Sequence, residues 1–368
     1  MHPRGEGSAG RTSVLPGSEA SVGPVPLQVL DPTSGGEWDG LVGTHPGASF
    51  FHGSAWANVL RDAYGHRPFY ILGARGGRVL GLLPLMEVQS VLTGRRGVAL
   101  PFADECPPLE SEQVTRRQLF EKALEIGRSR KWSYVECRGS EGFGGSEAPS
   151  VSFYAHTLDL TRGEQDLFAG LDSPARRAIR KARREGLRFE ISRSLDGMRI
   201  FYGLHCRTRR KHGLPPQSFG FFQAVFGWII EREAGFIGLV YQGTEPLAAL
   251  VFFYSGRRAI YKYGASNEKY LSLRANNLAM WEAILWLGNH GFAELHFGRS
   301  SRGGEGLRRY KMSWGAVERR LDYWRYDLGK NAFVGGRDRA AGWHNRVFRA
   351  LPLPVCRWVG AALYPHLS

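Results

Sequence analysis

The sequence predicts an α/β (α+β) protein of two successive domains, each a mixed, twisted sheet flanked by helices. Three observations support this class. The chain has 368 residues, more than a single domain usually holds. Segments with strand periodicity alternate with segments of helical periodicity. The second half repeats, in broadly the same order, the helices, hairpin strands and strand–loop–helix–strand unit of the first half.

Composition suggests where the chain divides. Residues 1–24 are rich in Gly, Ser and Pro and have no apolar core, so we expect a disordered leader and not a secretory signal. The first domain is expected over residues 25–150 and the second over 151–328. Residues 329–368 are expected to form a basic, amphipathic tail, which either packs on the body of the protein, as we favour, or lies on a membrane surface.

In the first domain, Arg75-Gly76-Gly77-Arg78 joins two strands as a tight hairpin. A loop bounded by prolines then carries two carboxylates, Asp104 and Glu105. The apolar and polar pattern predicts strands at 26–30, 68–73, 79–88 and 133–138, and helices at 54–64 and 114–130.

In the second domain, Ser173-Pro174 is a start signal for a strongly basic helix. Gly298 is expected to close a strand that starts at Glu294, and the glycines at 303–306 are expected to form a flexible loop. The pattern predicts further strands at 152–160, 235–241, 247–254 and 258–263, and helices at 175–185, 195–211, 218–232 and from about 272 to 288.

The start of the helix near residue 272 has the chemistry of an anion site. Arg274, Asn276 and Asn277 would place a guanidinium and backbone N–H groups at a helix N-terminus, which suits a phosphate or pyrophosphate. The alternative is an ordinary first turn with an exposed arginine, because this short pattern is not a specific fingerprint.

The basic helix has two interpretations. Arg176, Arg180 and Arg183 recur at helical spacing and share one face, which would contact the phosphates of RNA, of a nucleotide-sugar or of a lipid-linked pyrophosphate. The same residues would equally form a solvated face that keeps the protein soluble.

Charge and motifs exclude several classes. The formal net charge of +15 indicates anionic partners without choosing among them. The chain has no phosphate-binding loop, serine elbow or zinc-protease motif, and its four cysteines lack metal spacing. We therefore expect no metal, no bound cofactor and a reducing, cytoplasmic setting.

A family resemblance rests on four runs in a fixed order. They are KYGAS at 262–266, LRANNLAMWEAI at 273–284, FGRS at 297–300 and GLRRYKMSWGA at 306–316. Their order resembles the second half of the Fem-type (FemAB/FemX-like) transferases and of similar acyltransferases associated with exopolysaccharide genes. The likeness covers roughly residues 49–326. It implies two tandem GNAT-like domains and transfer of an aminoacyl or acyl group in cell-wall (peptidoglycan) or exopolysaccharide biosynthesis.

The resemblance also implies roles for particular residues. Lys311, after Tyr310, is similar to the aromatic–lysine pair that handles the donor and the developing negative charge, although many relatives have Phe in place of Tyr. Asp104 is similar in position to an acidic residue that would contact the acceptor or act as base; its alternative is an ordinary turn residue. By position on their strands, we expect Lys262, Tyr263, Arg299 and Ser300 to bind substrate or donor in the same cleft.

These points predict an acyltransferase or aminoacyltransferase that modifies an amine or hydroxyl of a nucleotide-linked or lipid-linked sugar precursor. The donor would be acyl-CoA or aminoacyl-tRNA, so tRNA is a possible partner. The enzyme would be cytoplasmic or peripheral at the inner face of the membrane. The alternative is a non-catalytic protein that binds RNA or a nucleotide-sugar in an envelope-assembly complex.

Overall fold

The computed structural model describes residues 23–336 and 348–368, except 92, 140–142 and 146. The expected disordered leader therefore lies, up to residue 22, outside the described residues, as does the part of the expected tail from 337 to 347. Within the described residues, no helix combines the length and the apolar character needed to cross a membrane.

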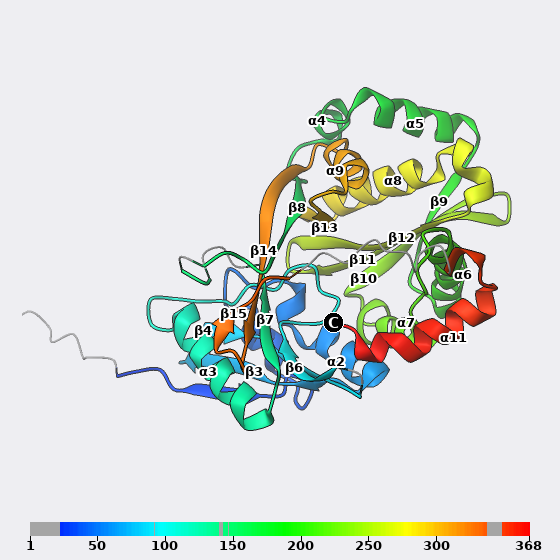
Figure 1. The fold of residues 1–368 in the computed structure, drawn as a ribbon. Helices are drawn as coiled ribbons and strands as arrows, with labels where there is room; N and C mark the ends of the chain where they lie inside the picture. The colour runs from blue at the N-terminus through cyan, green and yellow to red at the C-terminus, as the bar shows by residue number, and fades with distance from the viewer. Residues whose placement is uncertain (1–22, 92, 140–142, 146, 337–347) are drawn as a thin grey trace, which may run out of the picture.

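One large sheet runs through both halves of the molecule (Figure 1). Strand β14 (Val317–Asp327), late in the chain, pairs with a strand of the first half on one edge and a strand of the second half on the other. The order across the sheet is β2 (Arg67–Pro68), β5 (Met86–Ser90), β6 (Gly94–Val98), β7 (Tyr134–Arg138), β14, β8 (Val151–Asp159), β13 (Glu294–Ser301), β12 (Arg258–Ser266), β11 (Glu245–Ser255), β10 (Gly235–Gln242) and β9 (Arg188–Ser192), with β15 (Ala332–Phe333) on β14. A separate sheet holds β1 (Leu27–Leu30), β3 (Tyr70–Arg75) and β4 (Arg78–Leu83).

Helices cover these sheets. Figure 1 shows α5 and α8 beside the strands of the second half, and α3 beside those of the first. The α-helices are α1 (Trp38–Val42), α2 (Ser54–Tyr64), α3 (Arg116–Arg130), α4 (Glu164–Ala169), α5 (Ser173–Arg184), α6 (Leu195–Lys211), α7 (Phe219–Val225), α8 (Ala275–Asn289), α9 (Glu305–Met312) and α11 (Leu353–Leu363). Shorter helical turns are η1 (Phe50–His52), η2 (Phe226–Ile230), η3 (Glu268–Leu273) and η4 (Tyr364–His366).

The two halves share one structural unit, as the order of elements predicts. An antiparallel pair, β5–β6 or β11–β12, leads to a helix and then to a strand parallel to the last one. In the first half that helix is α3 and the strand is β7; in the second they are α8 and β13. The parallel pairs are short, with two register positions for β6–β7 and three for β12–β13.

The cores follow from the apolar periodicity. Leu278, Trp281 and Ile284 of α8 recur at helical spacing and are buried against the second half of the sheet. Trp56 of α2 and Phe221 of α7 meet at 5.9 Å between ring centroids, in a core to which both halves contribute. This shared core fixes the two halves against each other.

Several expected boundaries are wrong: β12, for example, was expected over 258–263 and continues to Ser266. The run 79–88 is two strands in different sheets, β4 and β5, because Pro84 lies between them and cannot donate a strand hydrogen bond. Strand β13 does not close at Gly298 but continues to Ser301 through an irregularity in its pairing. The glycine-rich stretch is shorter than expected, since α9 starts at Glu305 and places Lys311 on a helix.

The described part of the tail packs on the body. Tyr364 accepts a hydrogen bond from Arg209 (2.8 Å) and donates one to the Pro215 carbonyl (3.2 Å). Gly360 is buried where α11 crosses the chain at residue 216, and a Cβ there would lie 1.8 Å from the Pro216 carbonyl oxygen. Only glycine therefore allows this contact.

Gly360→Ala is expected to push α11 off the body and to lower the stability by about 2 kcal/mol, the usual cost of overpacking. Thermal unfolding and the rate of proteolysis of the tail measure this. Gly203→Ala is the matched control, because Gly203 lies in α6 with open space where its Cβ would be. An equal effect of both substitutions would contradict the packing described.

Candidate active site

The parallel strands β12 and β13 separate in the middle of the sheet. They pair only over Arg258–Ile260 and Glu294–His296, and beyond these residues they diverge. The pairing of β13 with β8 is irregular between His296 and Arg299, and Gly298 there has a left-handed φ of +71°. A gap between two parallel strands is a place where an extended ligand can lie against the backbone.

Lys311 reaches this divergence from α9. Its ammonium donates to the carbonyl oxygens of Gly298 (2.9 Å) and Arg299 (2.8 Å), and only 3% of the residue is exposed. Burial lowers the pKa of Lys311 to about 8, against the opposing effect of the Asp104 carboxylate. Lys311 is therefore a buried cation at neutral pH that can lose its proton near pH 8.

Asp104 comes to the same place from the first half. Its carboxylate accepts from the Lys262 ammonium (3.1 Å), which also donates to the Phe102 carbonyl (2.6 Å). Burial would raise the pKa of Asp104, but the charges of Lys262 and Arg299, with His296, outweigh it and hold the pKa at about 2. Asp104 is therefore an ionised anchor for cations and a weak base.

The loop that carries Asp104 is held in an uncommon conformation. Leu100 and Phe102 both have positive φ values, 51° and 61°. Arg138 donates to the carbonyl oxygens of Leu100 (3.1 Å) and Ala103 (3.2 Å), and the Tyr323 hydroxyl donates to that of Asp104 (2.5 Å). These bonds compensate for the backbone strain, as is usual at functional sites.

Of the other residues expected in the cleft, Arg299 lies close to Asp104, Ser300 is buried on β13, and Tyr263 lies in the aromatic core. The Arg299 guanidinium lies 4.1 Å from the centroid of the Phe153 ring and 5.0 Å from that of Tyr323, close to Asp104. Ser300 is buried, and its hydroxyl has no hydrogen-bond partner among the described residues. Tyr263 instead packs in the aromatic core, with Phe201 and Phe222.

The N-terminus of α8 faces a basic pocket of about 500 Å³. Arg274, with a left-handed φ of +63°, precedes the helix, and no side chain in the described part of the chain caps it. Arg177 and Lys181 of α5 line the pocket with Arg274, Asn277 and Tyr310, whereas Asn276 does not. The cations of this pocket, together with the positive end of the α8 dipole, form a candidate anion site.

The corresponding helix of the first half is closed to anions. Thr115 and Gln118 cap α3 reciprocally, with the Thr115 N–H donating to the Gln118 amide oxygen (2.8 Å). The Glu110 carboxylate accepts from the Arg116 N–H (3.1 Å) and pairs with the Arg116 side chain. The protein's own groups thus occupy the place that stays open on α8.

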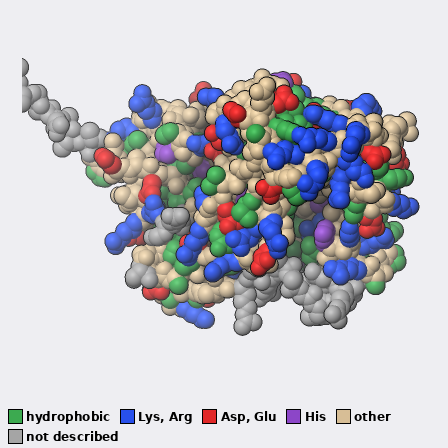
Figure 2. Space-filling view, turned by 90° about the horizontal axis from the view of Figure 1, so that it is seen from above, with side chains coloured by type: hydrophobic (Ala, Val, Ile, Leu, Met, Phe, Trp, Pro, Cys, Tyr) green, Lys and Arg blue, Asp and Glu red, His purple; other side chains and the backbone are tan. Residues whose placement is uncertain are grey.

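Helix α5 has cations on two sides. Arg177 and Lys181 face the pocket at α8, while Arg176, Arg180 and Arg183 line a second hollow with Glu164 and Asp166. Each cation of the second hollow contacts another group of the protein. Arg176 donates to the Ala169 carbonyl (3.0 Å), and the Arg180 guanidinium lies over the Phe168 ring. Arg183 forms an ion pair with Glu282. Figure 2, seen from the end of the molecule that carries α4, α5 and α9, shows Lys and Arg side chains gathered on this face.

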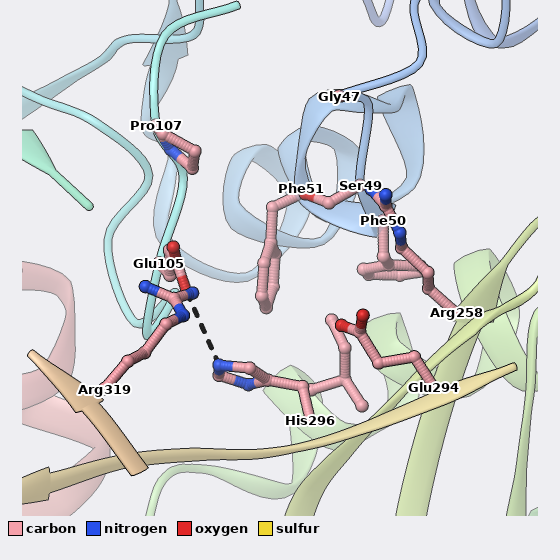
Figure 3. A pocket seen from close by; sticks show the side chains of 11 residues that line it. Gly47, Ser49, Phe50, Phe51, Glu105, Pro107, Arg258, Glu294, His296 and Arg319 are labelled. Carbon is pink, nitrogen blue, oxygen red and sulfur yellow. Dashed lines mark hydrogen bonds and ion pairs between the residues drawn. The ribbon is translucent and has the colours of Figure 1, made fainter. Parts of the chain in front are cut away.

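A small pocket of about 200 Å³ opens between the halves (Figure 3). Glu105, which follows Asp104 in the chain, is one of the residues that line it. Glu105, Arg319 and His296 turn toward one another at one end, and Arg258 and Glu294 lie at the other. His296 accepts at Nδ1 from the Gly298 N–H (3.0 Å), and its Nε2 lies 3.4 Å from Glu105. A neutral His296 therefore carries its proton on Nε2 and has no free lone pair to act as base.

Sequence reasoning singled out none of Glu105, His296 or Arg319 as a site residue. The paired carboxylates at 104–105 are a signal by which Glu105 could have been found. Arg319 had no local signal, because its position depends on where β14 inserts in the sheet. Among the described residues, no three His, Cys, Asp or Glu side chains are grouped as a metal site would require.

Comparison with known proteins supports the fold assignment. Residues 173–312 match the family model of the acetyltransferase (GNAT) domain. Together with the repeated unit and the sheet order, this establishes two tandem GNAT-like domains, as expected from the sequence. No curated protein matches the sequence significantly.

Solved structures share this architecture at low identity. FemX superimposes with a TM-score of 0.62 and 14% identity over 81% of this chain and 96% of its own. The C-terminal domain of a protein assigned as a lysylphosphatidylglycerol synthetase, from Agrobacterium fabrum, gives 0.53 and 12% over 89% and 96%. A tandem GNAT protein from the clavulanic acid biosynthesis pathway gives 0.52 and 13% over 83% and 99%. At such identities the likeness establishes the fold.

Asp104→Asn is expected to destabilise the protein by about 3 kcal/mol, because Lys262 would stay buried without its counter-charge. The double variant Asp104→Asn/Lys262→Met should recover much of that loss, since it removes both charges. Urea denaturation of the two single variants and the double variant measures the coupling. Strictly additive losses would show that the two side chains do not stabilise each other.

Proposed function

We propose that the protein is an acyltransferase or aminoacyltransferase that modifies an amine or hydroxyl of a cell-envelope or polysaccharide precursor. One observation carries the proposal: α8 has an open, cation-lined N-terminus, whereas the protein's own groups close the N-terminus of α3. Helix α9 links this pocket to the divergent strands, because Tyr310 lines the pocket and Lys311 bonds the backbone of β13.

The proposed reaction needs positioning and charge stabilisation rather than a covalent intermediate. The donor's phosphates would bind at Arg274, Arg177 and Lys181, and its acyl carbonyl would reach toward the divergence of β12 and β13. The acceptor's neutral amine or hydroxyl would attack the acyl carbonyl carbon, and the Lys311 ammonium would stabilise the oxyanion that forms. Collapse of this intermediate would break the donor's acyl bond and release the CoA thiol or the tRNA hydroxyl, with the acceptor's proton passing to the leaving group or to water. Asp104, ionised at neutral pH, would attract an acceptor that arrives as an ammonium, which must lose a proton to water before it attacks.

Two donors fit different parts of the basic face. Acyl-CoA has a compact pyrophosphate, which suits the single pocket at α8. Aminoacyl-tRNA has a long polyanion, which would also extend along Arg176 and Arg180. The Fem-type resemblance and the fold shared with a lysylphosphatidylglycerol synthetase support an envelope acceptor, either nucleotide-linked or lipid-linked. The proposed setting is cytoplasmic, in part at the inner face of the membrane.

Donor binding tests the site. Arg274→Ala and Lys181→Ala should each weaken binding of the true donor about tenfold, the effect of losing a charged hydrogen bond. Titration of acetyl-CoA and of aminoacyl-tRNA at two salt concentrations measures this. Arg117→Ala is the control, because Arg117 is an exposed arginine on α3, whose N-terminus is capped.

The outcomes separate the donors. If acetyl-CoA binds and only Arg274→Ala and Lys181→Ala weaken it, the donor is an acyl-CoA. If tRNA binds with a steep salt dependence and Arg176→Ala and Arg180→Ala also weaken it, the donor is aminoacyl-tRNA. Binding of neither donor, or losses equal to that of Arg117→Ala, would contradict the proposal.

The pH dependence of turnover tests the charge on Lys311. If the ammonium is the active form, turnover falls as the pH rises through about 8, where Lys311 loses its proton. Lys311→Arg, which stays protonated, should keep measurable turnover and lose this decline. An increase through pH 8 that Lys311→Arg abolishes would instead make neutral Lys311 a base.

Lys311→Ala separates catalysis from simple binding. An enzyme should lose turnover by about 100-fold or more, as when an oxyanion donor is removed, while donor affinity at α8 stays unchanged. Parallel measurement of turnover and donor affinity in this variant decides the matter. An affinity change without any turnover in the unsubstituted protein would favour the non-catalytic binding protein.

A further inference from the structure

Helices α6 and α11 form a surface on which apolar and cationic side chains are combined. Cys356, Gly360 and Tyr364 recur at a spacing of four residues and are buried against the body. The opposite side of α11 carries Val355, 40% exposed, and Trp358, 73% exposed. We call this surface, with the cations that border it, the α6–α11 face.

The cations come from both helices and from the segment just before α11. The Arg357 guanidinium lies 5.3 Å from the centroid of the Tyr202 ring of α6. Arg210 lies near Cys356, and its charge acts to lower the pKa of that thiol. Arg349 lies near His212 and acts to lower its pKa in the same way. Lys211 completes the group at the end of α6.

No acidic side chain balances these cations locally in the sequence. Neither residues 197–230 nor residues 339–368 contain an Asp or Glu. Between them these segments supply all of α11 and all but the first two residues of α6. An exposed tryptophan near arginines that form no ion pair with another described residue is complementary to a surface that is anionic outside and apolar just beneath.

We propose that the α6–α11 face docks on a membrane that contains anionic lipids. Trp358 and Val355 would enter the interfacial layer, and Arg349, Arg357, Arg210 and Lys211 would contact lipid phosphates. With 11 residues, α11 is too short to span a bilayer, so it would lie along the surface.

This face is connected to the candidate active site. The Tyr364 ring, at the end of α11, lies 5.7 Å from that of Phe102, between ring centroids. The Phe102 carbonyl accepts from Lys262, which pairs with Asp104. Docking would place the loop that carries Asp104 near the membrane, where a lipid-linked acceptor is found. The docking proposal itself is independent of acyl transfer.

Co-sedimentation of the full chain with vesicles tests the proposal. Vesicles of phosphatidylglycerol and phosphatidylcholine should bind the protein, and vesicles of phosphatidylcholine alone should bind it far less. Trp358→Ala should weaken binding about tenfold, as the loss of a buried aromatic side chain does. Arg349→Gln and Arg357→Gln should each weaken it about fivefold, the effect of one cation at an anionic surface.

Matched controls lie on other surfaces. Val29→Ala removes an exposed apolar side chain from β1, and Arg117→Gln removes an exposed cation from α3. Both should bind vesicles like the unsubstituted protein, and thermal unfolding checks that each variant is folded. Absence of vesicle binding, or equal losses in the controls, would overturn the proposal. So would loss of self-association in Trp358→Ala without vesicle binding, because it would make the face a protein interface.

Discussion

The divergence of β12 and β13 is the constraint on which the rest of the site depends. Once the two strands separate, backbone carbonyls of the bulge in β13 need donors from elsewhere. The Lys311 ammonium supplies two such bonds, to Gly298 and Arg299, which explains why a lysine is buried there. A Cβ on Gly298 would lie 3.1 Å from the Asp104 carboxylate, so glycine also lets the loop of the first half approach.

The repeated unit differs between the two halves in the surroundings of its helix N-terminus. In both, a helix follows a strand and leads to a parallel neighbour, which points the helix N-terminus toward the same kind of gap. Thr115, Gln118 and Glu110 close this position on α3, while Arg274, Arg177 and Lys181 keep it cationic on α8. The first half instead contributes Asp104 and its strained loop, so the cleft needs both halves.

Local sequence predicted most of the helices and strands through their periodicity. Arg274 was suggested by its place at a helix start and Lys311 by the Fem-type resemblance, and both stay predictions as site residues. The contacts of these residues could not be predicted, because they depend on tertiary placement. The pairing of Asp104 with Lys262 joins residues 158 positions apart. The same holds for Tyr263, which lies in an aromatic core although its strand borders the site. Arg177 and Arg176 of α5 line different pockets, and which pocket each one lines depends on where α8 packs.

If the proposed function is right, a donor anion binds at the open N-terminus of α8 and not at its counterpart α3. Amide hydrogen exchange, with and without acetyl-CoA or aminoacyl-tRNA, tests this most directly. The donor should slow exchange in the first turn of α8, at residues 275–278, and leave residues 116–119 of α3 unchanged. Protection of α3 alone, or of neither helix with donor bound, would contradict the proposed function.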